Sequence, residues 1–529
     1  MKKSYTKNYL KIYATQFIAI IVNILSFVIV IPYLSNNSKI YGVYSLCISF
    51  TIFFSYADLG FFNAGYKYAS EYYATNNKKK EIEITGFVSL ILSIFLFLLS
   101  IVLICFAYHP SWLIKDISGG DSIIAKRLLL ILAVFSPNMI LQRMLQIIYG
   151  IRVHDYILQR VLVIINIFKI SSIYFFISKQ GYNIVGYFLF CQVVTSIGLI
   201  SALLYAVKSF SIPLKILIQN IRFSKEVFQG VKSLAFSSLY VTIAWILFYE
   251  FDPYVIAKLS GAEAVAFYSL GLTCLAFFRT VFGMLFNPFS ARFNHFIAVK
   301  DFEGLTTMSK TVMCTLLPAV VLPTLSLALL SKPLVFTWVG DKFEQSVKII
   351  TYLSLCNILG FITYPASILV VATKKIKMLY YTSTSQLIVY WLGIAIFFQK
   401  HGYIVFAYFE LVCFLGTAMF YVWFICDFLG MNILKFIKTV ILPALPPVIL
   451  LMLILFSVRG FLPLQKSKTG LFEVVFTGAA AAFLATVLYY FTSKFFRNYI
   501  DLLFLKFRKS RSKVKAANTF SLNTYNDKA

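Results

Sequence analysis

Three cationic side chains interrupt long apolar runs of the sequence, where charged groups are rare. They are Arg143, Lys169 and Arg279. In the middle of a membrane-spanning helix, a charged side chain costs roughly 2.5–3.5 kcal/mol on insertion scales. Ionisable groups at such depth usually face a bundle interior or a water-filled cavity, and they mark the path of a substrate or ion. The three residues therefore predict a cationic site for an anionic ligand.

Polar side chains recur at helical spacing around these cations. They are Gln16 and Asn23 in the run 12–34, Asn138, Gln142 and Gln146 in the run 128–148, and Asn166, Lys169 and Ser172 in the run 161–178. Residues three, four or seven apart share one face of a helix. We expect these faces to line a polar cavity, with Arg143 beside the second of them.

Carboxylates inside the apolar runs are few. We expect Asp58 at the inner end of the second run, Glu250 and Asp252 at the outer end of the seventh, and only Glu410 at depth. Cations therefore outnumber deep anions, and Glu410 is the candidate for coupling transport to an ion gradient. Alternatives remain open for the cations: Arg143 and Arg279 could extend to the inner interface, and Lys169 could pair with a carboxylate.

Other chemistries lack their motifs. The sequence contains no phosphate-binding GxxxxGK[ST], no GxSxG, no HExxH and no CxxC, and its four histidines are scattered. The eight cysteines lie mostly within apolar runs, where we expect buried thiols and no disulfide. We expect no metal, no cofactor, no catalytic residue and no nucleic-acid partner. A net charge of +28 is typical of the basic cytoplasmic loops of membrane proteins.

The composition indicates an all-α polytopic membrane protein. Of 529 residues, 60% are hydrophobic and 13% are charged, against roughly 25% charged in soluble domains. A span needs about 20 mostly apolar residues, which predicts about 14 transmembrane helices. They are 12–34, 41–62, 84–107, 128–148, 161–178, 184–207, 234–256, 265–286, 311–331, 349–371, 379–399, 402–424, 439–458 and 471–491. Lys and Arg concentrate on the side that places both termini in the cytoplasm.

An internal repeat predicts two lobes. The stretch 31–46 contains Pro-Tyr and then Tyr-Ser-Leu, and the stretch 252–270 contains the same two motifs. In both copies Phe-Phe begins nine residues after the Tyr of Tyr-Ser-Leu. Six spans separate the copies, so they share one orientation, as in transporters built from two parallel six-helix lobes. The predicted organisation is an N-lobe 1–210, a cytoplasmic connector 211–233, a C-lobe 234–426, two further helices in 427–493, and a basic cytoplasmic tail 494–529.

The segments Ile40-Tyr-Gly-Val-Tyr-Ser-Leu, Tyr56-Ala-Asp-Leu-Gly and Asn76-Asn-Lys-Lys-Lys resemble the start of the polysaccharide transporter family. These are the Wzx-type O-antigen flippases of the multidrug/oligosaccharidyl-lipid/polysaccharide exporter superfamily. The stretch 252–270 is similar to the same family. The resemblance implies two pseudo-symmetric six-helix lobes around a central cavity, plus two C-terminal helices, in the bacterial inner membrane.

The resemblance also implies a function. The cargo would be an undecaprenyl-pyrophosphate-linked oligosaccharide on its way to O-antigen, lipopolysaccharide or similar surface polysaccharide, moved by alternating access and driven by protons or sodium ions. Lys169 would hold the pyrophosphate or an acidic sugar, with Arg143 and Arg279 collecting it from the cytoplasmic side. Polysaccharide polymerase and chain-length proteins are possible partners. Three alternatives stay open: a drug/cation antiporter of the same superfamily, a peptidoglycan-precursor flippase, and an enzyme such as a polysaccharide polymerase or polytopic glycosyltransferase.

Overall fold

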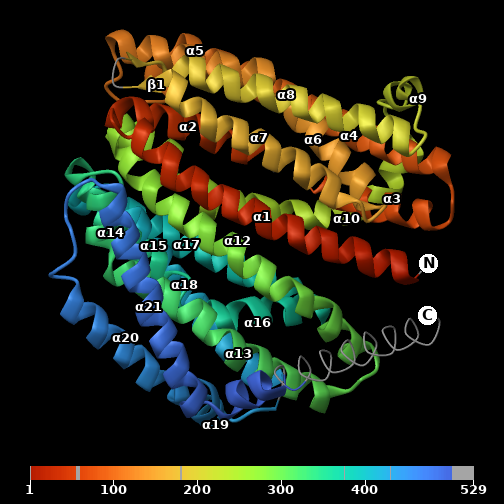
Figure 1. Ribbon diagram of the computed structural model, residues 1–529. Coiled ribbons are helices and arrows are strands. Elements are labelled where there is room, and N and C mark those ends of the chain that lie inside the picture. Colours follow the sequence, from red (N-terminus) through yellow and green to blue (C-terminus); the bar gives the residue numbers. More distant parts are fainter. Residues whose placement is uncertain are drawn as a thin grey trace, which may run out of the picture. The chain divides into compact units, whose positions relative to one another are not determined.

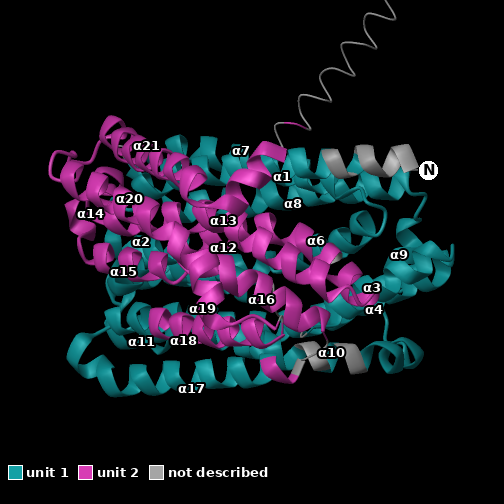
Figure 2. Cartoon of the chain, turned by 90° about the horizontal axis from the view of Figure 1, so that it is seen from below, with its two compact units in different colours: residues 1–273, 379–409 teal, residues 274–378, 410–529 magenta. Residues whose placement is uncertain are grey.

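The computed structural model describes residues 2–54, 60–178, 181–373, 376–428, 430–502 and 505. Within them the chain is almost entirely helical (Figure 1). Asp58 and the rest of the segment 55–59 lie outside the described residues, as does the predicted tail apart from 494–502 and 505. The chain forms two compact units (Figure 2). Unit 1 comprises residues 1–273 and 379–409, and unit 2 comprises 274–378 and 410–529.

Unit 1 contains most of the N-terminal elements. They are α1 (Lys2–Leu34), α2 (Ser38–Phe54), α3 (Phe61–Ala74), α4 (Lys78–Tyr108), η1 (Pro110–Trp112), α5 (Gly119–Phe135), α6 (Pro137–Gly150), α7 (Asp155–Phe176), β1 (Ile177–Ser178), β2 (Gly181–Tyr182), α8 (Ile184–Ser209), α9 (Leu214–Gln219), α10 (Lys225–Trp245), η2 (Ile246–Glu250), α11 (Asp252–Ser260), the start of α12 (Ala262–Ala298) and nearly all of α17 (Ile376–His401). The strands β1 and β2 pair antiparallel, with Ile177 opposite Tyr182.

Unit 2 contains the remaining elements. They are the rest of α12, α13 (Phe302–Leu329), α14 (Ser331–Trp338), η3 (Asp341–Phe343), α15 (Gln345–Leu355), α16 (Gly360–Ala372), most of α18 (Ile404–Phe428), α19 (Ile433–Phe436), η4 (Ile437–Ile441), η5 (Leu442–Ala444), α20 (Leu445–Val458) and α21 (Lys468–Thr492). Its core packs α13 against α20 and α21, and the buried Tyr489 hydroxyl donates to the Cys314 carbonyl oxygen at 3.0 Å.

The prediction of an all-α polytopic membrane protein is confirmed. The described residues contain 11 helices long and apolar enough to span a membrane, or up to 13 if each of two bent helix pairs is one span. The shorter apolar helix Ser38–Phe54 comes in addition. Every one of the 14 predicted runs overlaps one of these helices or pairs, although their ends differ. The division into two six-helix lobes stays a prediction.

Two differences from the predicted spans affect the site. The eighth predicted span ends at 286, but α12 continues to Ala298 because the polar residues after 286 still fit a helix. Arg279 therefore lies near the middle of that helix. The seventh predicted span ends at 256, but its apolar pattern continues to Ser260 across a 41° bend. Asp252 therefore lies at the bend between the two helices of this pair, before the apolar pattern ends.

Helix starts follow local capping chemistry. The side chains of Asn77, Asn183, Ser224, Asp301 and Ser467 each accept a hydrogen bond from the backbone N–H three residues on. Short polar side chains at this position satisfy backbone N–H groups that a helix leaves open. These caps fix where α4, α8, α10, α13 and α21 begin, and hence where their polar faces point.

Both copies of the predicted repeat lie in unit 1 and pack against each other. A Cβ at Gly42 of α2 would lie 1.7 Å from the carbonyl oxygen of Ala262 at the start of α12. Beside this contact the Ser38 hydroxyl donates to Glu263 at 2.6 Å. The rings of Phe50 and Tyr254 meet edge to face at 4.5 Å. A glycine is therefore required in the Tyr-Gly-Val-Tyr motif because two helix backbones touch there.

Candidate functional site

The polar stripes of the first and fifth predicted spans meet. Helix α7 lies between α1 and α8 in unit 1 (Figure 1). The Asn166 amide on α7 donates to the Asn23 amide oxygen on α1 at 3.2 Å. Gln16, two turns before Asn23, is half-buried on α1. Amide pairs of this kind hold transmembrane helices together, by about 0.6 kcal/mol on average.

Lys169 lies one turn beyond Asn166 on α7 and is half-buried. The group that acts on it electrostatically is Cys191 on α8. Among the described residues, no carboxylate forms an ion pair with Lys169. The ion-pair alternative for this lysine therefore finds no support in the described part of the chain. An ammonium group in an apolar span without a carboxylate is suited to attract an anion.

Aromatic side chains flank the Lys169 region. Tyr44, from the Tyr-Ser-Leu motif on α2, meets Phe188 edge to face at 5.8 Å and Tyr187 at 6.3 Å. Tyr44 also interacts electrostatically with Cys191, the neighbour of Lys169. The region thus combines one cation with phenol hydroxyls and aromatic rings from α2 and α8.

Ser172 takes a different role from the one predicted. Its side chain is buried, and its hydroxyl donates to the backbone carbonyl oxygen of Lys169 at 2.9 Å. Serine in an apolar helix often bonds the preceding turn in this way. The hydroxyl therefore serves the backbone of α7, although its position on the predicted face is as expected.

The stripe on α6 divides into two parts. Arg143 donates to the Gln146 amide oxygen at 3.0 Å and lies over the ring of Phe62 on α3 at 4.7 Å. Asn138 instead contacts α8, where it donates to the Gln192 carbonyl oxygen at 3.3 Å and accepts from the Ser196 hydroxyl at 2.9 Å. Gln142 lies half-buried between the two parts. Asn138 therefore fastens α6 to α8, whereas Arg143 faces α3.

Arg279 and Glu410 lie in unit 2 and share one region. Glu410 on α18 is 1% exposed, and Arg279 on α12 is half-buried. Both act electrostatically on the thiol of Cys356, and Arg279 also acts on Tyr364 of α16. The sequence assigned these two charges separate roles, binding and ion coupling. The structure instead brings both charges near the same thiol.

Asp252, which the sequence predicts at the outer end of the seventh run, is a second buried carboxylate. Asp252 is 0% exposed, and its Oδ2 accepts from the hydroxyls of Tyr268 at 2.5 Å and Tyr390 at 2.6 Å. It begins α11 directly after the π-helical turn η2. The sequence signal was present, because Asp-Pro opens a helix and the apolar pattern continues to Ser260.

A feature that sequence reasoning missed is a buried ion pair beside a cavity in unit 1. Arg152 donates to the Glu81 carboxylate at 2.5 Å and to the Ile148 carbonyl oxygen at 2.9 Å. The two side chains are 6% and 5% exposed. Next to them lies a cavity of about 350 Å³. Its lining residues are Tyr73, Asn76, Lys78, Glu81, Arg152, His154 and Phe210.

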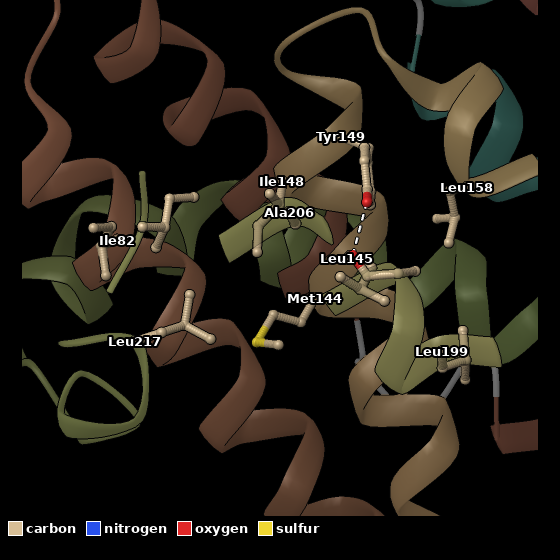
Figure 3. Packing of buried hydrophobic residues seen from close by; sticks show 11 residues of the cluster. Ile82, Met144, Leu145, Ile148, Tyr149, Leu158, Leu199, Ala206 and Leu217 are labelled. Carbon is tan, nitrogen blue, oxygen red and sulfur yellow. Dashed lines mark hydrogen bonds between the residues drawn. The ribbon is translucent and has the colours of Figure 1, made fainter. Parts of the chain in front are cut away.

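A hydrophobic cluster reaches the cavity at Phe210, which packs against it and also lines the cavity. Tyr149, Leu145 and Ile148 of α6 pack against Ile82 of α4 and against side chains of α8 and the segment after it (Figure 3). The Tyr149 hydroxyl donates to the Ala202 carbonyl oxygen at 2.8 Å. The starts of α4 and α7 and the ends of α6 and α8 are thereby held together.

The described part of the chain contains no candidate metal site. No group of three or more His, Cys, Asp or Glu side chains there could hold a metal ion. The arrangement places cationic and carboxylate side chains inside apolar helices, and such groups suit reversible binding of charged ligands.

Comparison with known proteins shows the fold. No protein-family model matches the sequence, and a search of curated proteins gives no significant match. The structure is similar to that of the lipid II flippase MurJ in an inward closed conformation, with a TM-score of 0.63, 14% identity, and coverage of 92% of this chain and 99% of MurJ.

Two structures of a multidrug resistance MATE family transporter of the MOP superfamily are also similar. The inward-facing one has a TM-score of 0.56 and 11% identity and covers 78% of this chain and 98% of its own. The outward-facing one has a TM-score of 0.53 and 13% identity and covers 81% and 97%. The chain is therefore a multi-pass membrane protein with the fold shared by MurJ and these transporters of the MOP superfamily.

Proposed function

We propose that this protein is a flippase for undecaprenyl-pyrophosphate-linked oligosaccharide repeat units. It moves them from the cytoplasmic to the outer leaflet of the bacterial inner membrane by alternating access, with both termini in the cytoplasm. The cargo serves O-antigen or a similar surface polysaccharide. Lys169 carries the proposal, because it is a mid-span cation without a carboxylate partner among the described residues. The fold likeness to a lipid II flippase supports it.

The chemistry of the cargo matches this region. A pyrophosphate must cross the apolar interior, where an unpaired charge is costly. Lys169 offsets that cost with a compact ammonium group that can rotate its three donors and release the anion again. The Asn23–Asn166 pair one turn away offers further hydrogen bonds. Arg143, over the Phe62 ring, is the second cation of unit 1 for the head group. Arg279, in unit 2, is the third cation.

An ion gradient would supply the energy. Among the described residues, Glu410 and Asp252 are buried carboxylates in apolar helices that could exchange a proton or sodium ion. Two tyrosine hydroxyls donate to Asp252 and stabilise the buried carboxylate. Binding of a proton or sodium ion at either carboxylate would then favour the inward-facing or the outward-facing conformation over the other.

A drug/cation antiporter is the second candidate. The buried Asp252 favours it, since a cationic substrate would use a buried carboxylate. The similar MATE transporters are described as multidrug resistance transporters. An enzyme is less well supported, because the similar folds belong to a flippase and to transporters. Polysaccharide polymerase and chain-length proteins remain proposed partners.

The test is the leaflet location of the undecaprenyl-linked glycan in cells deleted for the gene. Accumulation on the cytoplasmic face, with loss of surface polysaccharide, supports translocation. Complementation with Lys169→Ala should then restore little export at equal protein level. Lys400→Ala, an exposed lysine at the end of α17, is the matched control and should restore it fully. Repeat units that reach the outer face but stay unpolymerised would contradict the flippase and favour a polymerase.

The two transporter candidates separate in a second assay. Efflux of cationic drugs that depends on Asp252, together with normal glycan export in the deletion strain, would favour the antiporter. Loss of export without any change in drug sensitivity would favour the flippase.

A further inference from the structure

The cavity beside Arg152 is formed by three loops that carry unusual backbone conformations. Asn76, Val153 and Ser211 have φ values of 56°, 57° and 51°. They follow the ends of α3, α6 and α8, and together they make up three of the five non-glycine residues with positive φ among the described residues. Left-handed backbone is unfavourable for such residues, above all for the β-branched Val153. Strain of this kind concentrates at ligand clamps and switches.

Val153 has a direct consequence for the cavity. It stands between Arg152 and His154, both of which line the cavity. The turn closes with the His154 N–H bonding to the Tyr149 carbonyl oxygen at 3.0 Å. The His154 Nδ1 bonds to the Arg152 carbonyl oxygen at 2.7 Å. The turn at Val153 thus places the side chains of Arg152 and His154 in the wall of the same cavity.

The carboxylate in the cavity wall is already neutralised. Glu81 is held by Arg152, whose guanidinium also lies between the rings of Tyr73 at 4.9 Å and Phe210 at 5.0 Å. Arg152 is therefore committed to the structure. The charge that remains on the wall is that of Lys78, and it is positive.

Lys78 has a donor to spare. Its ammonium group donates to the carbonyl oxygens of Ser211 at 2.7 Å and Phe210 at 3.2 Å. An ammonium group has three N–H donors, so two carbonyl bonds fix its position and leave one N–H for a ligand. The amide of Asn76, the hydroxyl of Tyr73 and the second ring nitrogen of His154 are further polar groups in the wall.

We infer that this cavity is a binding site for a phosphate-bearing anion, separate from the proposed path at Lys169. Lys169 lies fifteen residues beyond His154 on α7, which at 1.5 Å per residue is about 22 Å away. Apart from Tyr73 and Asn76 at the end of α3, the walls are the ends of helices long and apolar enough to span a membrane. We therefore expect the site to open where the membrane meets water. Basic pockets in this position suit the head groups of anionic lipids, and a soluble phosphate offers the same chemistry.

The test measures binding to the full-length protein in neutral detergent. Native mass spectrometry counts bound phosphatidylglycerol against phosphatidylcholine, and thermal stability is followed with inorganic phosphate. Lys78→Gln should weaken phosphatidylglycerol binding about tenfold, as expected for one charge-assisted hydrogen bond. Lys80→Gln is the matched control, because Lys80 is on the same helix turn and pairs with Glu226 outside the cavity. It should bind as the wild type does.

The outcomes separate the sources of the phosphate. If inorganic phosphate also stabilises the wild type but not Lys78→Gln, a soluble phosphate is sufficient; if only the lipid acts, the head group is the ligand. Equal lipid binding by Lys78→Gln, Lys80→Gln and the wild type would overturn the inference. His154→Ala provides a second, independent loss of binding should Lys78→Gln fold poorly. None of these measurements depends on glycan export.

Discussion

Arg152, which precedes α7, and Lys169, which lies within it, are buried or half-buried cations with opposite surroundings. Arg152, just before the helix, has a carboxylate at 2.5 Å, a carbonyl oxygen and two aromatic rings around it. Lys169, within the helix, has no carboxylate partner among the described residues and lies near the Cys191 side chain. The first charge is satisfied by its surroundings. The second one leaves the protein with an attraction for anions that the fold does not use.

This difference separates structural from functional charge. Breaking a buried ion pair leaves its partner buried and uncompensated, so it costs stability. Removing an unpaired charge from an apolar span removes a cost instead. Stability and transport should therefore respond in opposite ways at Arg152 and Lys169.

The largest effect is expected for Arg152→Ala. It should lower the free energy of unfolding by about 3–5 kcal/mol, because Glu81 is left buried without its partner. Thermal unfolding of the purified protein measures this. The double variant Arg152→Met with Glu81→Leu should recover most of the loss, since no charge is then left behind. A double variant as unstable as the single one would show that the aromatic contacts of Arg152 matter more than its charge.

Lys169→Met should leave the unfolding free energy unchanged or raise it by up to about 2.5 kcal/mol, the cost of a charge in a span. Glycan export should fall steeply in the same variant. A loss of stability similar to that of Arg152→Ala would show that Lys169 has a structural partner, and it would remove the main support for the substrate site. Thermal unfolding and export are measured on matched amounts of protein.

Asn23→Ala removes the amide bond between α1 and α7. The expected destabilisation is about 0.6–1.7 kcal/mol, the range for hydrogen bonds between helices in membranes. If the Asn23–Asn166 pair also contacts the cargo, glycan export should fall further than the loss of folded protein explains. Thr15→Ala on the same helix is the control, because its hydroxyl bonds only to the preceding turn at Lys11 and Ile12.

The smallest effect is expected for Val153→Gly. Glycine adopts the φ of 57° without a Cβ clash, while it costs more chain entropy on folding. The balance should be a change of about 0–1 kcal/mol towards greater stability. A clear loss of stability would mean that the Val153 side chain packs favourably enough to outweigh the strain, which thermal unfolding would reveal.

The spans and several polar contacts followed from the sequence. Spacing alone put Asn166 and Lys169 on one face of α7, and Asn23 lies opposite that face in the structure. Spacing also put Asn138 and Gln146 on one face of α6, yet Asn138 bonds to α8 and Gln146 to Arg143. A shared helix face therefore predicts only coarsely which neighbouring helix a side chain contacts, because a helix inside a bundle has neighbours on more than one side.

Hydropathy by itself determined that this protein crosses the membrane many times as helices. In a bilayer every backbone polar group must be satisfied within its own segment, so long apolar runs have few alternatives. The repeat likewise pointed to two related helix pairs, whose contact at Gly42 the structure shows.

Only the tertiary structure decided which charges have partners. Glu81 and Arg152 are 71 residues apart, and Asp252 and Tyr390 are 138 apart. Nothing in local spacing relates such residues, because their pairing depends on how helices from distant parts of the chain pack. The physical reason is that hydropathy is a property of each segment, whereas the compensation of a buried charge is a property of its surroundings in the fold.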